Sequence, residues 1–142
     1  MRDDISTNVK QFAHRLIEFE TGTATAASVG DHTSPAFCVC EKLRQPLSRL
    51  AGVAGFRSLL SRALALASGE LRWLKAIHIA ADGSLKGWDD TQAQLSPHEI
   101  REGEVLLVTQ LLGLLVTFIG EGLTMRLLLD AWPDVAFDDR QG

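Results

Sequence analysis

The sequence has no tyrosine and only two cysteines among its 142 residues. Its aromatic residues are three tryptophans and six phenylalanines, too few for the repeated stacking platforms that bind single-stranded nucleic acid. The two cysteines are too few and too close together for a disulfide framework, which is typical of a reducing compartment. The first residues contain no apolar run of the signal-peptide type, so we expect a cytoplasmic protein.

Motifs that carry catalysis are also missing. The sequence contains no glycine-rich phosphate loop, nucleophile elbow or paired-carboxylate motif. Its histidines have no fixed spacing to a nucleophile; they are His14, His32, His78 and His98. We therefore predict a non-enzymatic protein with no catalytic residues and no cofactor.

A metal site is the one alternative that the cysteines raise. His32, Cys38 and Cys40 lie close together in the sequence. If residues 35–50 are helical, however, the two cysteines point about 200° apart and cannot both bind one ion. No metal site is predicted, although the sequence leaves open whether His32 or Cys38 binds a metal.

The most prominent feature is a long apolar segment near the C-terminus. Residues 105–120 contain no charged residue, and the apolar pattern continues to Trp132 and Pro133. On a helical period these side chains are apolar on nearly every side, so protein or lipid must surround the helix. Because a chain of this length has few other elements, we expect a second subunit to help cover it.

One narrow stripe of this helix is small and polar, and it predicts the subunit contact. The stripe consists of Gly113, Thr117, Gly120 and Thr124, whose size lets another helix approach closely. The charge-free run is shorter than the roughly 20 apolar residues of a membrane span. It is bounded by Glu104 and Glu121 without a basic flank. A buried helix in a water-soluble homodimer is therefore favoured over a membrane-spanning helix.

The remaining periodicity predicts an all-α bundle of about four to five helices around the long C-terminal helix. Residues 1–20 form a helical arm, with the helix near 7–20, and the small residues of 21–35 form a flexible linker. The core domain spans 36–133 and residues 134–142 form a polar tail. The arm is expected to pack on its own core, on a second subunit or on another protein.

Within the core, residues 34–35 resemble an N-cap followed by proline, and Pro46 predicts a kink in the helix that follows. Gly52 and Gly55 predict a break before a helix over 54–68. Residues 71–88 fit either a small hairpin or a single helical turn. Ser96 to Glu99 has the spacing of a capping box, and a bend is expected at 120–122 before the end near Ala131.

Charge is distributed unevenly along the chain. Residues 41–75 hold seven lysines and arginines against two acids, whereas residues 76–142 hold four against eleven. Segments of opposite sign can pair within one subunit or across a two-fold axis. The basic block also leaves weak phosphate or nucleic-acid binding as a third functional alternative, although the acidic chain as a whole disfavours nucleic acid.

The leading hypothesis is a protein-interaction or regulatory module that acts as a homodimer. The second hypothesis is a small-molecule sensor or carrier with an apolar pocket between its helices. Tryptophans at element ends and one acid on an apolar helix would line that pocket; they are Trp73, Trp88, Glu121 and Trp132.

Overall fold

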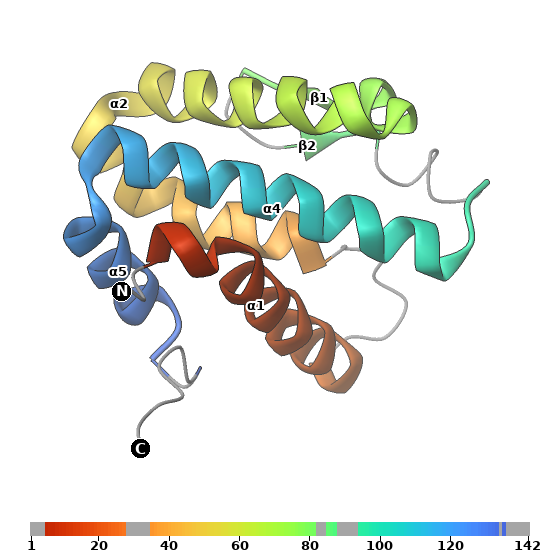
Figure 1. The fold of residues 1–142 in the computed structure, drawn as a ribbon, viewed down its shortest axis with the longest axis horizontal. Helices are drawn as coiled ribbons and strands as arrows, with labels where there is room; N and C mark the ends of the chain where they lie inside the picture. Colours follow the sequence, from red (N-terminus) through yellow and green to blue (C-terminus); the bar gives the residue numbers. More distant parts are fainter. Residues whose placement is uncertain (1–4, 28–34, 82–84, 88–93, 134, 136–142) are drawn as a thin grey trace.

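The computed structural model describes residues 5–27, 35–81, 85–87, 94–133 and 135 of the chain. These residues form four long helices, as the all-α prediction requires: α1 (Ile5–Ala27), α2 (Pro35–Glu70), α4 (Pro97–Ile119) and α5 (Glu121–Ala131). In Figure 1, α4 runs through the middle of the molecule, with α1 on one side and the second half of α2 on the other. The fold is therefore an all-α arrangement in which α4 is the most enclosed helix.

Helix α1 packs on α4 and α2 through one apolar face. Its residues recur at helical spacing and are each at most 9% exposed; they are Val9, Phe12, Ala13, Leu16 and Ile17. The helix is longer than the expected 7–20, because residues 21–27 of the predicted linker are helical. Residues 28–34, the rest of that linker, lie outside the described part of the chain.

Helix α2 is interrupted at a glycine rather than at its proline. Gly52 has φ 82° and ψ 162°, a region of backbone space that is essentially restricted to glycine. The break expected there is confirmed, whereas the backbone remains helical at Pro46. Pro46 removes one backbone hydrogen bond, but fully buried Leu43 and Leu47 hold the helix on either side of it.

The C-terminal apolar segment forms two helices instead of one. Helix α4 begins with a complete capping box, in which Ser96 Oγ accepts from the Glu99 N–H and the Glu99 carboxylate accepts from the Ser96 N–H. It ends at Gly120, whose φ of 88° and ψ of 161° resemble those of Gly52. Helix α5 starts at the next residue, so the bend predicted at 120–122 is confirmed.

Both alternatives for residues 71–88 are present in part. A short 3-10 helix, η1 (Arg72–Ala76), is followed by β1 (His78–Ile79) and β2 (Leu85–Lys86). The two strands pair antiparallel, with His78 opposite Lys86 and Ile79 opposite Leu85. Residues 82–84, between the two strands, lie outside the described residues. Of the predicted tail, the structure describes only Val135.

The chain itself covers most of α4, but not all of it. A row of fully buried residues faces α1 and α2; they are Leu107, Val108, Leu111, Leu112 and Leu115. In the last turn, by contrast, Thr117 is exposed and the Phe118 side chain is 56% exposed. The apolar surface that needs a cover is therefore concentrated at the junction of α4 and α5.

Candidate functional site

The predicted interface stripe is divided by the bend at Gly120. Thr124 turns into the core, where it is fully buried and its hydroxyl donates to the Gly120 carbonyl at 2.7 Å. Thr117 is exposed and donates to the Gly113 carbonyl at 3.1 Å. Apart from the neighbouring backbone of the same helix, no atom lies within 4 Å of where a Cβ would stand on Gly113 or Gly120. Three of the four stripe residues thus have open space beside them, and Thr124 does not.

The structure does not bring the predicted pocket residues together. Trp73 in η1 packs against Gly103 near the start of α4, and Trp132 follows the end of α5. Glu121 begins α5, and Trp88 lies outside the described residues. None of the three described residues lines either of the two hollows considered below.

Trp132 instead belongs to a polar cluster that joins α1, α2 and the end of α5. Its indole N–H donates to Glu20 Oε2 at 2.7 Å, although Glu20 and Trp132 are only 2% and 1% exposed. The Lys42 ammonium group pairs with the same carboxylate oxygen at 2.7 Å. It also lies 5.4 Å and 5.7 Å from the ring centroids of Phe19 and Trp132, within cation–π range. The cluster satisfies a buried carboxylate and locks three helices together.

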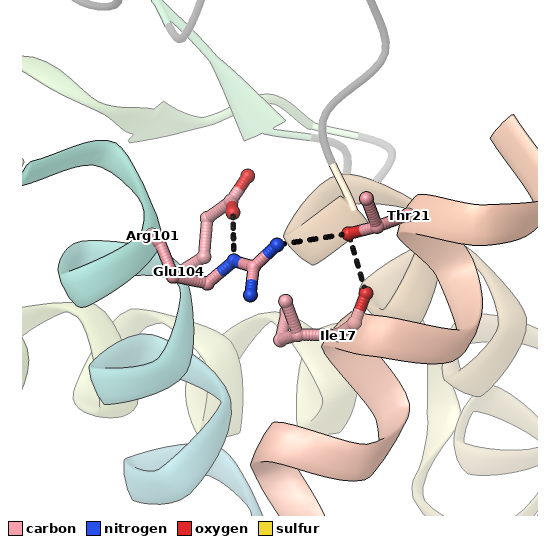
Figure 2. A network of polar contacts seen from close by, with 4 residues as sticks. All are labelled: Ile17, Thr21, Arg101 and Glu104. Atoms are coloured by element: carbon pink, nitrogen blue, oxygen red, sulfur yellow. Dashed lines mark hydrogen bonds and ion pairs between the residues drawn. The ribbon is translucent and has the colours of Figure 1, made fainter. Parts of the chain in front are cut away.

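A second buried carboxylate lies between α1 and α4 (Figure 2). Glu104 is 2% exposed, and its Oε2 has no hydrogen-bond partner in the described part of the chain. Arg101 Nε lies 3.9 Å from Glu104 Oε1, and Arg101 Nη2 donates to Thr21 Oγ1 at 3.4 Å. The Thr21 hydroxyl in turn donates to the Ile17 carbonyl at 2.7 Å. Arg101 therefore connects the two helices through a chain of polar contacts.

The surroundings of Glu104 favour its neutral form. Burial raises the pKa of this carboxyl from 4.5 to about 7, against the lowering effects of the Arg101 charge and of a hydrogen bond from the Ala36 N–H. The charged form of Glu104 is destabilised because Arg101, the one cation paired with it among the described residues, lies at the outer limit of ion-pair distance. Glu104 is thus a titratable group inside the fold near neutral pH.

Two hollows open on the surface of the described residues. One of about 470 Å³ lies between α1 and α4, and Arg101 forms part of its wall. The other, about 790 Å³ and more open, lies beside the second half of α2 and is lined by Arg57, Arg62 and Phe118 among others. The first is a candidate ligand site, and the second adjoins an exposed apolar surface.

That apolar surface lies at the end of the molecule where α2 bends and α4 passes into α5 (Figure 1). We define the bend-end patch as Leu50, Val53, Phe118 and Leu123, which are 51%, 50%, 56% and 40% exposed. Phe118 lies beside residues 54–62 of α2, which brings the two bends together. Exposed apolar groups gathered in one place mark interaction surfaces more often than isolated ones do.

The cysteine region offers little metal chemistry among the described residues. Cys40 is buried, and burial raises the pKa of its thiol to about 12, which disfavours the thiolate that binds metals. Cys38 is half-buried, and His32 lies outside the described residues. Within the described ranges, no group of three or more histidine, cysteine or acidic side chains is placed to hold a metal ion.

Two described segments, Cys38–Glu70 and Pro97–Ile119, are long and apolar enough to cross a membrane by length and composition. The core helices of soluble proteins meet the same criteria, and the core-facing side of α4 is buried within this chain. Comparison with protein-family models, curated proteins and solved structures finds no match to this chain. The class that the structure defines is therefore an all-α protein, and its function is argued from its own surface.

Buried Glu20 and Glu104 are absent from the residues that sequence reasoning selected. A signal was present, because both acids fall at helical spacing on an otherwise apolar face. Glu20 follows Leu16 and Ile17 by four and three residues, and Glu104 precedes Leu107 and Val108 by three and four. The periodicity therefore identifies buried acids, but not the partners that satisfy them.

Proposed function

We propose that this chain is a non-enzymatic interaction module that works as a homodimer, with the bend-end patch at the subunit contact. The observation that carries the proposal is the gathering of four large apolar side chains, each 40% to 56% exposed, at one end of the molecule. Burying such side chains releases roughly 25 cal/mol for each Å² of apolar surface. A partner that covers the patch would therefore be stabilised by the hydrophobic effect.

Charge supports a second copy as the partner. Arg57 and Arg62 are exposed and line the hollow beside Phe118. On α5, Glu121 and Asp130 are half-buried and exposed, respectively, and with the exposed Arg126 they leave the helix a net charge of −1. In a two-fold dimer each surface meets its own copy, so the basic α2 of one subunit can face the acidic α5 of the other.

The remaining stripe residues fit the same contact. Gly113, Thr117 and Gly120 have small side chains or none, and the last two lie within two residues of Phe118 at the end of α4. A helix surface without bulky groups lets a neighbouring helix pack at short distance. Thr124 is left out of the proposed contact, because it is buried within its own subunit.

The test is the solution mass of the wild-type chain and of a patch variant, measured by light scattering on a gel-filtration column. We expect the wild type to have twice the 15.5 kDa mass of one chain at micromolar concentration. Phe118→Ser removes the most exposed apolar side chain of the patch and should shift the mass toward one chain. Leu66→Ser is the matched control, because Leu66 is 44% exposed on α2 but is not part of the patch.

Two results would contradict the proposal. One is a wild-type mass of one chain, 15.5 kDa, at micromolar concentration. The other is a dimer that both variants retain, which would place the contact elsewhere. Co-sedimentation of a single-chain species with lipid vesicles would assign the patch to a membrane surface instead.

A further inference from the structure

The hollow between α1 and α4 has the size and shape of a small-molecule site. Its volume of about 470 Å³ falls within the range of roughly 300–1,000 Å³ that is typical of ligand pockets. Side chains from α1, the end of α2 and α4 line it; they are Lys10, His14, Glu70, Leu71, His98, Arg101, Glu102, Val105, Leu106 and Thr109. The hollow is separate from the bend-end patch, because the two share no residue.

Arg101 is the group in this wall that can anchor a ligand. A guanidinium has five N–H donors, of which Arg101 directs Nε toward Glu104 and one Nη2 hydrogen to Thr21. Its remaining nitrogen, Nη1, has no partner within the described residues and carries no dashed line in Figure 2. A half-buried guanidinium with unused donors favours an oxygen-rich anion, which it can bind through two parallel hydrogen bonds.

The other lining residues determine which anion fits. Leu71, Val105 and Leu106 provide an apolar floor, which favours a ligand with a hydrocarbon body. Around them, the charges of Lys10 and Arg101 are matched by those of Glu70 and Glu102. The two acids disfavour a dianion such as phosphate, whereas a single negative charge beside Arg101 meets little repulsion.

We propose that this hollow binds a small monocarboxylate with an apolar body, with the carboxylate on Arg101 and the body over Leu71, Val105 and Leu106. Thr109 stands at the end of the same wall, and its hydroxyl hydrogen is engaged by the Val105 carbonyl at 2.7 Å. The chain would then bind a small ligand in addition to associating with a second copy.

The experiment is a backbone-amide NMR titration of the full chain with three probes: hexanoate, hexanamide and inorganic phosphate. Hexanoate should shift amides lining the hollow on α1 and α4, with dissociation at least tenfold tighter than for the other two probes. Hexanamide tests the contribution of the negative charge, because it has the same hydrocarbon chain but no charge. Phosphate tests the apolar body, because it lacks one.

Two variants and a control make the assignment specific. Arg101→Gln should weaken hexanoate binding at least tenfold. Thr109→Trp leaves Arg101 in place and should also abolish binding, because the larger side chain fills the hollow. Arg126→Gln, which removes an exposed arginine from α5, should bind as the wild type does. Far-ultraviolet circular dichroism verifies that each variant is folded.

The proposal is overturned if hexanoate shifts no amides of the hollow, or if hexanamide or phosphate binds as tightly as hexanoate. Equal binding by the wild type and by folded Thr109→Trp would also overturn it. None of these results depends on the mass of the protein in solution, so the ligand site and the dimer fail or stand separately.

Discussion

At the scale of single residues, the two buried acids differ in how well the fold satisfies them. Glu20 receives an indole N–H and an ammonium group, each at 2.7 Å. Glu104 has one oxygen without a partner in the described residues and a cation only at 3.9 Å. A buried carboxylate without full compensation costs free energy whenever it is charged. The cost at Glu104 therefore depends on pH.

The sign of that dependence follows from the raised pKa of Glu104. Between the unfolded value of 4.5 and the folded value of about 7, the folded chain keeps a proton that the unfolded chain releases. The free energy of unfolding therefore falls as pH rises through this window, and the full loss is present above pH 7. A shift of this size corresponds to at most about 3 kcal/mol.

Glu104→Gln should remove this loss, because the amide is never charged and its oxygen can still accept from the Ala36 N–H. We expect the variant to have nearly wild-type stability at pH 4.5 and to be more stable than the wild type at pH 8. Urea unfolding at several pH values measures the difference. Glu102→Gln, on the same helix but exposed, is the control. A Glu104→Gln curve parallel to the wild type across this window would show that the charge of Glu104 costs nothing.

Sequence reasoning can find such residues but not their partners. Glu20 and Glu104 lie at helical spacing among apolar neighbours, so periodicity alone places both in the core. The indole that binds Glu20, however, is 112 residues away in the sequence. Likewise, the hollow beside Arg101 exists because of the relative position of α1 and α4. Helical periodicity does not indicate the relative position of α1 and α4, because that position depends on how the helices pack.

At the scale of elements, the sequence predicts helix ends and breaks well where a particular residue type is required by the backbone. The Ser96–Glu99 capping box and the breaks at Gly52 and Gly120 are all present as expected. At Pro46 the backbone stays helical, so the proline does not interrupt α2. The first helix extends past residue 20. The small residues that follow, such as Thr21, are typical of a linker and did not predict this extension. Local signals therefore predict breaks better than they predict continuity.

Two glycines of α4 provide a matched test of how the elements pack. A Cβ on Gly103 would overlap the indole ring of Trp73, whereas one on Gly113 would meet no atom within 4 Å. Replacing glycine by alanine within a helix normally adds up to about 1 kcal/mol of stability. We expect that gain for Gly113→Ala and a loss on the order of 1–3 kcal/mol for Gly103→Ala, because the ring must move.

Urea unfolding at a concentration where the chain is a monomer measures both changes without a contribution from association. Tryptophan fluorescence should change in Gly103→Ala, because the environment of Trp73 changes. A gain of stability in both variants would mean that η1 does not pack on the start of α4. A loss in both would mean that Gly113 also lies against another part of the same chain.

At the scale of the whole molecule, the apolar C-terminal segment is covered unevenly. The chain's own helices enclose the middle of α4, so that part of the segment needs no second subunit to cover it. Exposed apolar groups at one end of the molecule still favour a second subunit. They belong to Phe118, Leu123 and the residues at the bend of α2. The case for a dimer therefore rests on this end and no longer on the entire helix.

The most direct measurement of this claim is an isotope-filtered nuclear Overhauser experiment on a mixture of labelled and unlabelled chains. It detects only protons of different subunits that lie close together. We predict signals between the Phe118 ring of one chain and the methyl groups of Leu50, Val53 or Leu123 of the other. The absence of any such signal, or signals confined to residues outside the bend-end patch such as Leu66 and Leu129, would contradict the account.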